Sequence, residues 1–322
     1  MAIDVGAIVT VPPYAPFLDA VAAHPLVRGL RLNTVMPLRR EPGEMERVLA
    51  RLAATGKTVH IDLKGRQLRV VSAAVPPFTE VRVSHRLRVR TPAVAFFADG
   101  RERARVLAVD GDRLILEDGP RRFVGPGESV NIPCPSLRIE GTLTDTDRAY
   151  VAAAGAAGLH DFMLSFAERE ADVAEVEALD PRARVTLKVE SAAGLDLARR
   201  AGASLGRLMA ARGDLYVELA RPHRLAAALR EIVARDPEAI VASRLFPTLA
   251  FAAAPAAQDV TDAAYLLEIG YRTFMLGDEV CLRPESALAA LNLLEAIAAD
   301  APGPGARRLE TAAAAAAGAA GA

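Results

Sequence analysis

The sequence has very few cysteines and almost no net charge. Its 322 residues contain two cysteines, Cys134 and Cys281, and carry a formal net charge of −1. Two cysteines are too few for a disulfide scaffold, and neither has a cysteine or histidine partner at metal-binding spacing. We therefore interpret both as small apolar residues. The balanced charge gives no electrostatic footprint for nucleic acid or anionic lipid, which favours small-molecule chemistry.

Long apolar runs are missing as well. No stretch reaches the about 18 consecutive apolar residues that a membrane span needs, and Asp4 stands where a secretory signal would carry basic residues. The sequence therefore predicts neither a membrane segment nor a secretory signal. We expect a cytoplasmic protein that has no nucleic-acid or membrane partner.

Eight short runs rich in Val, Ile and Leu alternate with helical patterns along the chain. The runs are AIVTV (7–11), GLRLN (29–33), TVHIDL (58–63), DFMLSF (161–166), RVTLKV (184–189), RLMAA (207–211), IVASRL (240–245) and TFMLGD (273–278). Amphipathic stretches such as EMERVLARLAATG (44–56) and AAYLLEIG (263–270) lie between them and contain glycine at their ends, a helix C-terminal signal. Eight such units predict an α/β protein with a (β/α)8 TIM barrel, in which chemistry takes place where the strands end.

The repeat is interrupted after the third strand. From about 71 to 137 the helical pattern gives way to short strands with Pro and Gly turns, such as TEVRVSHRLRVR and RARVLAV. We predict an all-β lid domain, called the insertion (residues 71–137), on a barrel formed by residues 1–70 and 138–299. The tail, 300–322, has no core-forming residues, so we predict that it is disordered or a frayed alanine helix.

Lysine is also rare in this sequence. Of 39 Lys and Arg residues only Lys57, Lys64 and Lys188 are lysines. The alternation of the strand around Lys188 puts Lys188 and Glu190 on one face and the apolar residues on the other. Because the apolar face must pack on helices, we expect Lys188 and Glu190 to point into the barrel near its mouth. A buried ion pair adds little net stability, which favours a functional role for these two residues.

The next strand ends in the sequence ARGDL. Asp214 follows Gly213 there and can lie on a tight turn over the same mouth. Two carboxylates from neighbouring strand ends, Glu190 and Asp214, suit a hard cation such as Mg²⁺ or Mn²⁺ that takes its remaining ligands from water and substrate oxygens. The alternative is that Asp214 only caps the following helix.

Two earlier strands also carry polar residues at alternating positions. The runs GLRLN and HIDLKG align Arg31 with Asn33, and His60 with Asp62 and Lys64. A guanidinium at a strand end can hold a phosphate or carboxylate bidentately, so we expect Arg31 to contact substrate. His60 lies deeper in its strand, and we interpret it as a hydrogen-bonded core histidine rather than a catalytic base.

Six separated motifs resemble those of pyruvate kinase in order and spacing. They are GLRLN, IDLKGRQLR, VNIP, TLKVES, MAARGDLYVEL and VASRLF, and the resemblance spans about residues 5–295. The position of the insertion agrees with the resemblance too. What it implies is a barrel with a β lid, in which a divalent cation holds phosphoenolpyruvate and the enolate of pyruvate, with ADP or ATP as the second substrate.

The resemblance also implies roles for individual residues. Lys188 matches the lysine beside the transferring phosphoryl group, and Glu190 and Asp214 match the ligands of the divalent metal. Arg31 matches a phosphate contact. Ser243 stands where the family has a threonine near the enolate carbon, so we count Lys188, Arg31 and Ser243 as the expected catalytic residues.

Three further residues match cofactor contacts of the family. Arg69 matches an arginine that reaches nucleotide phosphates. Asn33 and Asp62 match two of the four side chains that surround a potassium ion, whereas the other two, a serine and a threonine, are Val35 and Leu63 here. The loss of both hydroxyl groups argues against activation by K⁺.

Other departures concern the nucleotide and regulation. Glu128 stands where the family has a lysine before its VNLP motif, and an acidic group there opposes a triphosphate by like-charge repulsion. The C-terminal domain that carries allosteric sites in many pyruvate kinases has no counterpart in the sequence, so we do not expect regulation of that kind.

Three functions are compatible with these features. The first is a Mg²⁺-dependent, pyruvate-kinase-like phosphotransferase acting on phosphoenolpyruvate or pyruvate. The second is a Mg²⁺-dependent lyase, aldolase or decarboxylase that acts on a 2-oxo acid without nucleotide, since the same electrostatics stabilise any enolate oxygen. The third is a sensor that binds an oxo acid or phosphoester without turnover. The sequence does not determine the oligomeric state, and a homo-oligomer is compatible with it.

Overall fold

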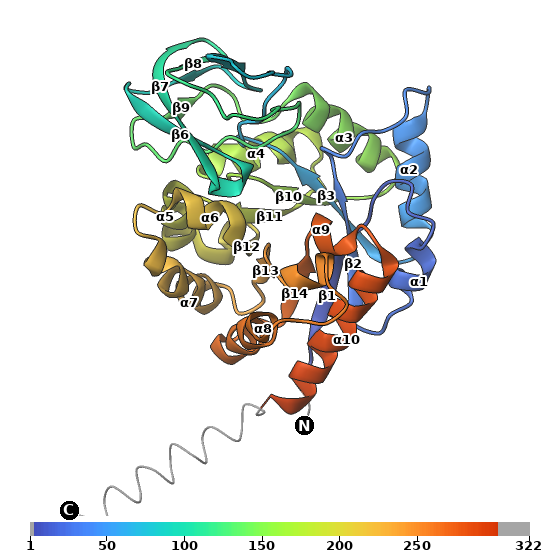
Figure 1. Cartoon of the computed structure of the whole chain (residues 1–322). Coiled ribbons are helices and arrows are strands. Elements are labelled where there is room, and N and C mark those ends of the chain that lie inside the picture. The colour runs from blue at the N-terminus through green and yellow to red at the C-terminus, as the bar shows by residue number, and fades with distance from the viewer. Residues whose placement is uncertain (1–2, 302–322) are drawn as a thin grey trace, which may run out of the picture.

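Eight parallel strands close into a barrel at the centre of the computed structural model, which describes residues 3–301 (Figure 1). Their order around the barrel is β1-β14-β13-β12-β11-β10-β3-β2. They are β1 (Gly6–Thr10), β2 (Val27–Asn33), β3 (Thr58–Leu63), β10 (Asp161–Leu164), β11 (Arg184–Val189), β12 (Arg207–Ala211), β13 (Ile240–Ala242) and β14 (Thr273–Leu276). The eight predicted strands are all found, which confirms the barrel. From residue 302 onward the tail predicted to be disordered lies outside the described residues.

Helices surround the barrel between successive strands. They are α1 (Leu18–Ala22), α2 (Glu44–Ala53), α3 (Asp145–Ala156), α4 (Glu170–Leu179), α5 (Ala192–Ala201), α6 (Arg212–Glu218), α7 (Leu225–Arg235), α8 (Ala257–Ile269), α9 (Asp278–Cys281) and α10 (Pro284–Asp300). In α2 the apolar residues Val48, Leu49 and Leu52 lie on one face and are buried, as expected for an amphipathic helix on a barrel. None of the helices in the described part of the chain is long and apolar enough to cross a membrane.

Apolar side chains fill both sides of the barrel wall. Outward-facing residues such as Leu32 and Ile61 are fully buried beneath the helices. A second apolar cluster, which includes Met163 and Met209, lies inside the barrel. In the strand register Met163 is the partner of Asp62, and Met209 is the partner of Lys188. The charged residues of the interior are therefore surrounded by apolar side chains, where electrostatic interactions are strong.

Between β3 and α3 the chain forms antiparallel β-structure. A four-stranded sheet has the order β4 (Glu80–Arg82), β8 (Arg113–Leu116), β7 (Glu102–Asp110) and β6 (Ala93–Phe97), and β5 (Leu87–Arg88) pairs with β9 (Arg138–Ile139). This β-structure has a hydrophobic core separate from that of the barrel, and the core includes Phe97, Val106 and Leu114. An isolated bridge joins Arg69 to Ser129, so β-pairing begins before residue 71 and continues past residue 137. The exact domain boundaries stay a prediction.

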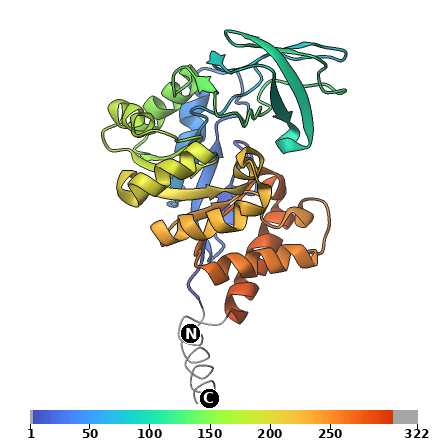
Figure 2. The same ribbon diagram turned by 90° about the vertical axis from the view of Figure 1, so that its left-hand side faces the viewer.

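The insertion lies at the end of the barrel where β3 ends (Figures 1 and 2). Its Asn131 side chain donates hydrogen bonds to Asp214 and Glu218 of α6. The backbone carbonyl of Asp99, in the 3-10 turn η1 (Ala98–Gly100), accepts a hydrogen bond from Arg244, which follows β13. These contacts bring the insertion over the C-terminal ends of β12 and β13.

Candidate active site

A cavity of about 280 Å³, called the mouth cavity, lies at the C-terminal ends of the barrel strands. Its walls contain seven of the eight residues predicted for the site: Arg31, Asn33, Arg69, Lys188, Glu190, Asp214 and Ser243. They come from β2, the segment after β3, β11 and the turns after β11, β12 and β13. The eighth residue, Asp62, does not line the cavity and is completely buried.

Asp62 is the centre of the charge network. Its Oδ2 accepts hydrogen bonds from the Arg31 guanidinium, 2.9 Å from Nε, and from Lys64 Nζ at 3.1 Å. Its Oδ1 accepts one from Lys188 Nζ at 3.1 Å. Burial alone would raise the pKa of Asp62, but the charges of Arg31, Lys188 and Lys64 hold that pKa well below its usual range. Asp62 is therefore ionised, and its carboxylate accepts hydrogen bonds from Arg31, Lys64 and Lys188.

Lys188 is kept charged by its neighbours. Its Nζ donates to Ser165 Oγ at 2.7 Å and lies 3.1 Å from Glu190 Oε1, in addition to its bond with Asp62. Burial lowers the pKa of a lysine, but the two carboxylates Asp62 and Glu190 outweigh this effect and raise the pKa of Lys188. The mouth cavity thus contains an ammonium group that is held in one position by three acceptors.

Glu190 and Asp214 meet in the mouth cavity from neighbouring strands. Glu190 Oε2 accepts the backbone N–H of Phe166 at 2.8 Å. Asp214 lies in the first turn of α6 and accepts hydrogen bonds from Gln67 Nε2 at 3.2 Å and Asn131 Nδ2 at 3.0 Å. Burial raises the pKa of Glu190 to about 7; Lys188 opposes this, whereas the negative charge of Asp214 adds to it. Glu190 therefore loses its proton less readily than an exposed glutamate, even though the Lys188 ammonium lies beside it.

This donor set can be compared with the requirements of a metal. Within residues 3–301 no group of three or more His, Cys, Asp or Glu side chains is arranged as a metal cage. Two carboxylates in one cavity, Glu190 and Asp214, nevertheless fit a hard divalent cation, because such ions keep several waters and bind substrate oxygens. The electrostatic cost of holding Glu190 ionised next to Asp214 is the kind of cost that a bound cation would relieve.

Two acidic residues of the site were missed at the sequence level. Asp278 is the first residue of α9, two residues after β14 ends at Leu276, and its carboxylate accepts hydrogen bonds from Arg31 Nη1 at 3.2 Å and Asn33 Nδ2 at 3.0 Å. Glu218 lies one turn after Asp214 on α6, and burial raises the pKa of Glu218 to about 8. The signals were present, since Asp278 is the last residue of the strand-like run TFMLGD (273–278) and Glu218 follows Asp214 by four residues.

The surroundings of Arg31 differ from the expected substrate clamp. Its guanidinium is engaged by Asp62, Asp278 and Thr10 Oγ1, and Arg31 is 6% exposed. A phosphate could reach it only by competing with Asp278. Asn33 is likewise held by Asp278, so the two residues that resemble potassium ligands, Asn33 and Asp62, both have partners within the protein.

Ser243 and Arg69 also line the mouth cavity, and both are more exposed than Lys188 and Glu190. An added Cβ on Gly213 would lie 3.4 Å from the Ser243 Cβ, which shows how closely the turn after β12 approaches the turn after β13. Arg69 donates to Gln67 Oε1 at 3.0 Å and to the carbonyl of Gly127 at 2.6 Å. Both acceptors are neutral, so the positive charge of Arg69 is not cancelled by these bonds.

Two other sequence interpretations need revision. Glu128 was expected to repel a nucleotide, but Arg122 Nη1 donates to Glu128 Oε2 at 2.9 Å and compensates its charge. His60 was expected to be a hydrogen-bonded core residue, yet its buried Nδ1 has no hydrogen-bond partner. His60 lines a different cavity of about 700 Å³ together with Thr58 and Asp161, at the N-terminal ends of the strands.

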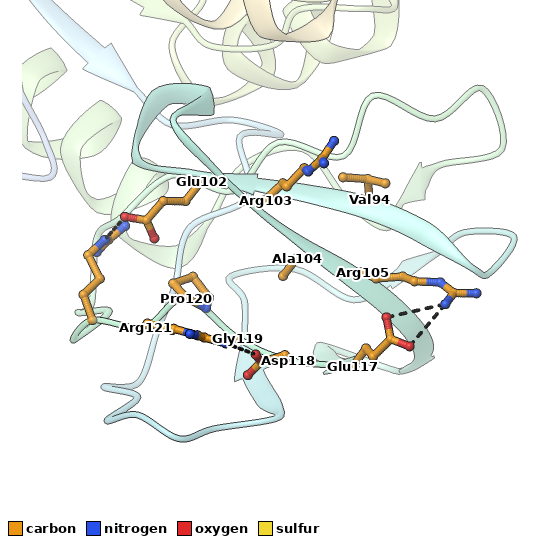
Figure 3. Close-up of a pocket in the computed structure, with 11 residues that line it drawn as sticks. Val94, Glu102, Arg103, Ala104, Arg105, Glu117, Asp118, Gly119, Pro120 and Arg121 are labelled. Carbon is orange, nitrogen blue, oxygen red and sulfur yellow. Dashed lines mark hydrogen bonds and ion pairs between the residues drawn. The ribbon is translucent and has the colours of Figure 1, made fainter.

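A third cavity, of about 690 Å³, lies on the insertion (Figure 3). Two of its arginines form close ion pairs with carboxylates: Arg105 pairs with Glu117 at 3.2 Å and Arg122 with Glu102 at 2.8 Å. No residue predicted for the site lines it. The network of ammonium and carboxylates belongs to the mouth cavity alone among the three, although that cavity is the smallest.

Comparison with known proteins finds similarity to the same family that the sequence motifs resemble. No family model matches the chain. Curated pyruvate kinases from Thermoplasma acidophilum, Borreliella burgdorferi and Agrobacterium vitis are 26%, 27% and 29% identical to it over 210, 190 and 199 residues. These matches cover 58%, 56% and 60% of this chain but only 38%, 39% and 40% of the three relatives. The chain therefore has a distant and partial relationship to pyruvate kinases.

Proposed function

We propose that the chain is a pyruvate-kinase-like phosphotransferase that moves a phosphoryl group between phosphoenolpyruvate and a nucleotide. The observation that carries the proposal is the convergence of Lys188, Glu190 and Asp214 on the mouth cavity. The similarity to curated pyruvate kinases, partial as it is, supports the same reaction class. The enolate of pyruvate is the species that this site would stabilise.

A divalent cation, Mg²⁺ or Mn²⁺, would be held by Glu190 and Asp214. When bound, it supplies positive charge next to developing negative charge on substrate oxygens. Lys188 supplies a second positive charge that is fixed in advance by Asp62 and Ser165. Preorganised charges of this kind need no rearrangement during the reaction, which is why they lower its barrier.

The insertion would act as the lid of this site. Asn131 contacts Asp214 after β12, and the carbonyl of Asp99 contacts Arg244 after β13. A lid in this position excludes water from the phosphoryl group and strengthens the electrostatic interactions beneath it. Arg69, at the base of the insertion, is the residue that we assign to the nucleotide phosphates.

A second candidate is a lyase, aldolase or decarboxylase of 2-oxo acids that uses the same metal site without a nucleotide. One observation favours it: the Arg31 guanidinium, which the phosphotransferase would use on the phosphoryl group, is occupied by Asp62 and Asp278. Stabilising an enolate oxygen requires only the metal, its two carboxylates and Lys188. We rank this function second because the sequence similarity is to kinases.

The two functions are separated by assaying one protein in parallel. We expect pyruvate from phosphoenolpyruvate and ADP with Mg²⁺ or Mn²⁺, and loss of this activity by about 100-fold or more in Glu190→Gln. Glu175→Gln, which removes a carboxylate from an ion pair with Arg148, is the matched control and should stay active. Absence of pyruvate under all metal and salt conditions, together with consumption of oxaloacetate without nucleotide, would replace the first function by the second. Oxaloacetate turnover that survives Glu190→Gln would contradict both.

A further inference from the structure

Arg244 brings a positive charge to the mouth cavity that the proposed reaction does not use. It lines the cavity and is exposed to solvent. Its guanidinium lies 5.0 Å from the centroid of the Tyr216 ring and donates to the backbone carbonyl of Asp99 at 3.3 Å. Over residues 3–301 no carboxylate forms an ion pair with Arg244. Arg69, which lines the same cavity, also donates to neutral acceptors, so the hydrogen bonds of these two guanidinium groups do not cancel their charge.

The backbone of Arg244 is held in an unfavourable conformation. Ser243 has φ of 69° and Arg244 has φ of 55°, both in the left-handed region that non-glycine residues seldom adopt. Such conformations persist only where the surroundings enforce them, and they cluster at binding sites. The shape of this turn is therefore maintained by specific contacts.

Arg212 provides these contacts. It is 5% exposed and donates to the carbonyl of Ser243 at 2.9 Å and to the carbonyl of Arg244 at 3.1 Å. Asp262 of α8 accepts from Arg212 Nη1 at 2.7 Å and fixes the guanidinium from the other side. The buried Arg212 thus holds the backbone of Ser243 and Arg244, which both line the mouth cavity, while the Arg244 side chain reaches the carbonyl of Asp99 in the insertion.

We propose that Arg244 is a specificity residue that binds a second anionic group of the substrates, a carboxylate or phosphate lying outside the reacting enolate. This inference rests on the proposed function of the mouth cavity. A planar guanidinium suits both anions because it can donate two parallel hydrogen bonds. The only hydrogen bond of the Arg244 side chain within the described chain is made to a neutral carbonyl, and it leaves donors for a ligand. The substrate class that follows is one with negative charge at two separate places, as in a 2-oxo dicarboxylate or a nucleoside diphosphate.

The experiment measures the binding of three probes by calorimetry, each in the presence of Mg²⁺. Oxalate mimics the pyruvate enolate and carries no distal anion, whereas oxaloacetate adds a carboxylate and ADP adds phosphates. In Arg244→Gln we expect oxalate to bind within about twofold of wild type, and oxaloacetate or ADP to bind at least about tenfold more weakly. Arg244→Lys should restore part of the loss, because it keeps the charge without the planar geometry. The weakened probe identifies the carboxylate or the phosphate as the bound group.

Arg230 offers a matched control. It also lies over a tyrosine ring, 5.4 Å from the centroid of Tyr265, but it does not line the mouth cavity. Arg230→Gln should leave the binding of all three probes unchanged, and thermal unfolding should show that both variants are folded. Equal binding of every probe by wild type and Arg244→Gln, or an equal loss that includes oxalate, would overturn the role of Arg244. Failure of the wild type itself to bind oxalate would instead overturn the proposed function, and this inference with it.

Discussion

At the scale of single residues, the charge of Asp62 organises the barrel interior. Arg31, Lys64 and Lys188 all donate to this one carboxylate, so the cations outnumber their shared anion. Among these cations, burial lowers the pKa of Lys64 to about 7. The negative charge of Asp62 opposes this shift, whereas the positive charges of Arg69, Lys188 and Arg31 add to it. Lys188, which has Glu190 as a second anionic partner, shows the opposite shift.

Replacing Asp62 by asparagine should destabilise the protein severely. The substitution keeps the shape but leaves three buried cations without their common anion, a change that costs about 3–5 kcal/mol. Urea unfolding measures the effect. Asp112→Asn, which breaks the more exposed pair with Arg82, should change the free energy of unfolding by about 0–1 kcal/mol. A small effect of Asp62→Asn would mean that Asp62 does not balance these cations.

The raised pKa of Glu218 predicts that the free energy of unfolding depends on pH. Burial raises its pKa from 4.5 to about 8; the hydrogen bond from Asn131 opposes this shift, and the charges of Asp214, Glu168 and Glu190 add to it. The folded protein therefore holds the proton more tightly than the unfolded chain. This contribution is fully present below pH 4.5 and is lost as the pH rises to about 8.

The variant Glu218→Gln isolates this effect, because glutamine cannot ionise. Relative to wild type, its free energy of unfolding should increase between pH 5 and pH 9 by on the order of 2–4 kcal/mol, measured by urea unfolding without metal. Glu177→Gln, at an exposed position of α4, is the control. Its free energy of unfolding should depend on pH in the same way as that of the wild type. Parallel curves for Glu218→Gln would show that Glu218 ionises normally in the folded protein.

At the scale of elements, Asp147 joins both ends of the β-structure that interrupts the barrel. This residue of α3 is completely buried. Its carboxylate accepts the backbone N–H groups of Lys64 at 2.8 Å and Gly65 at 3.1 Å, where the chain leaves β3. It also accepts the N–H and the hydroxyl of Thr144, where the chain returns to α3. One carboxylate thus fixes the exit and the re-entry of the chain at the mouth.

Asp147→Ala should therefore cost about 3 kcal/mol or more in the free energy of unfolding, because four donors lose their acceptor at a buried position. The control is Asp145→Ala, an exposed substitution in the same first turn of α3, with an expected cost of about 1 kcal/mol or less. Chemical denaturation of both variants checks the prediction. Equal losses would show that the helix terminus, rather than the junction, accounts for the effect.

Much of the barrel could be predicted from local patterns. The short apolar runs predicted each strand, and the alternation around Lys188 predicted correctly that Lys188 and Glu190 face inward, since both are buried and line the mouth cavity. Asp214 followed from the rule that strand ends share one mouth, whereas Ser243 was identified only through the resemblance to pyruvate kinase. The inference from alternation succeeded because periodicity depends only on the geometry of a single strand.

The pairing of charges could not be predicted in the same way. The carboxylate that a given cation contacts depends on the stagger between strands. The sequence of a single strand does not determine that stagger. Arg31 lines the mouth cavity, and its role as a substrate contact stays a prediction, but its partners Asp62 and Asp278, on β3 and after β14, were not predicted. Asp62 was expected to contact a cofactor but lies below the cavity surface. Tertiary contacts decide these partners.

At the scale of the whole molecule, ligand binding at the mouth should stabilise the barrel and the insertion together. The site takes residues from β2, β11 and the turns after β12 and β13, so a ligand that binds only the folded state raises the melting temperature. We expect Mg²⁺ with oxalate to raise it by several degrees in the wild type and not in Glu190→Gln. A scanning fluorimetry series with K⁺ in place of Mg²⁺ is the control and should show no such rise.

The most direct test of the central claim is a crystal structure of the protein with Mg²⁺ and oxalate. The account predicts a metal ion bound by Glu190 and Asp214, with oxalate oxygens completing its coordination and Lys188 Nζ within hydrogen-bonding distance of the oxalate. A structure in which the metal and oxalate bind elsewhere, or in which Glu190 stays paired only with Lys188 at saturating ligand, would contradict it.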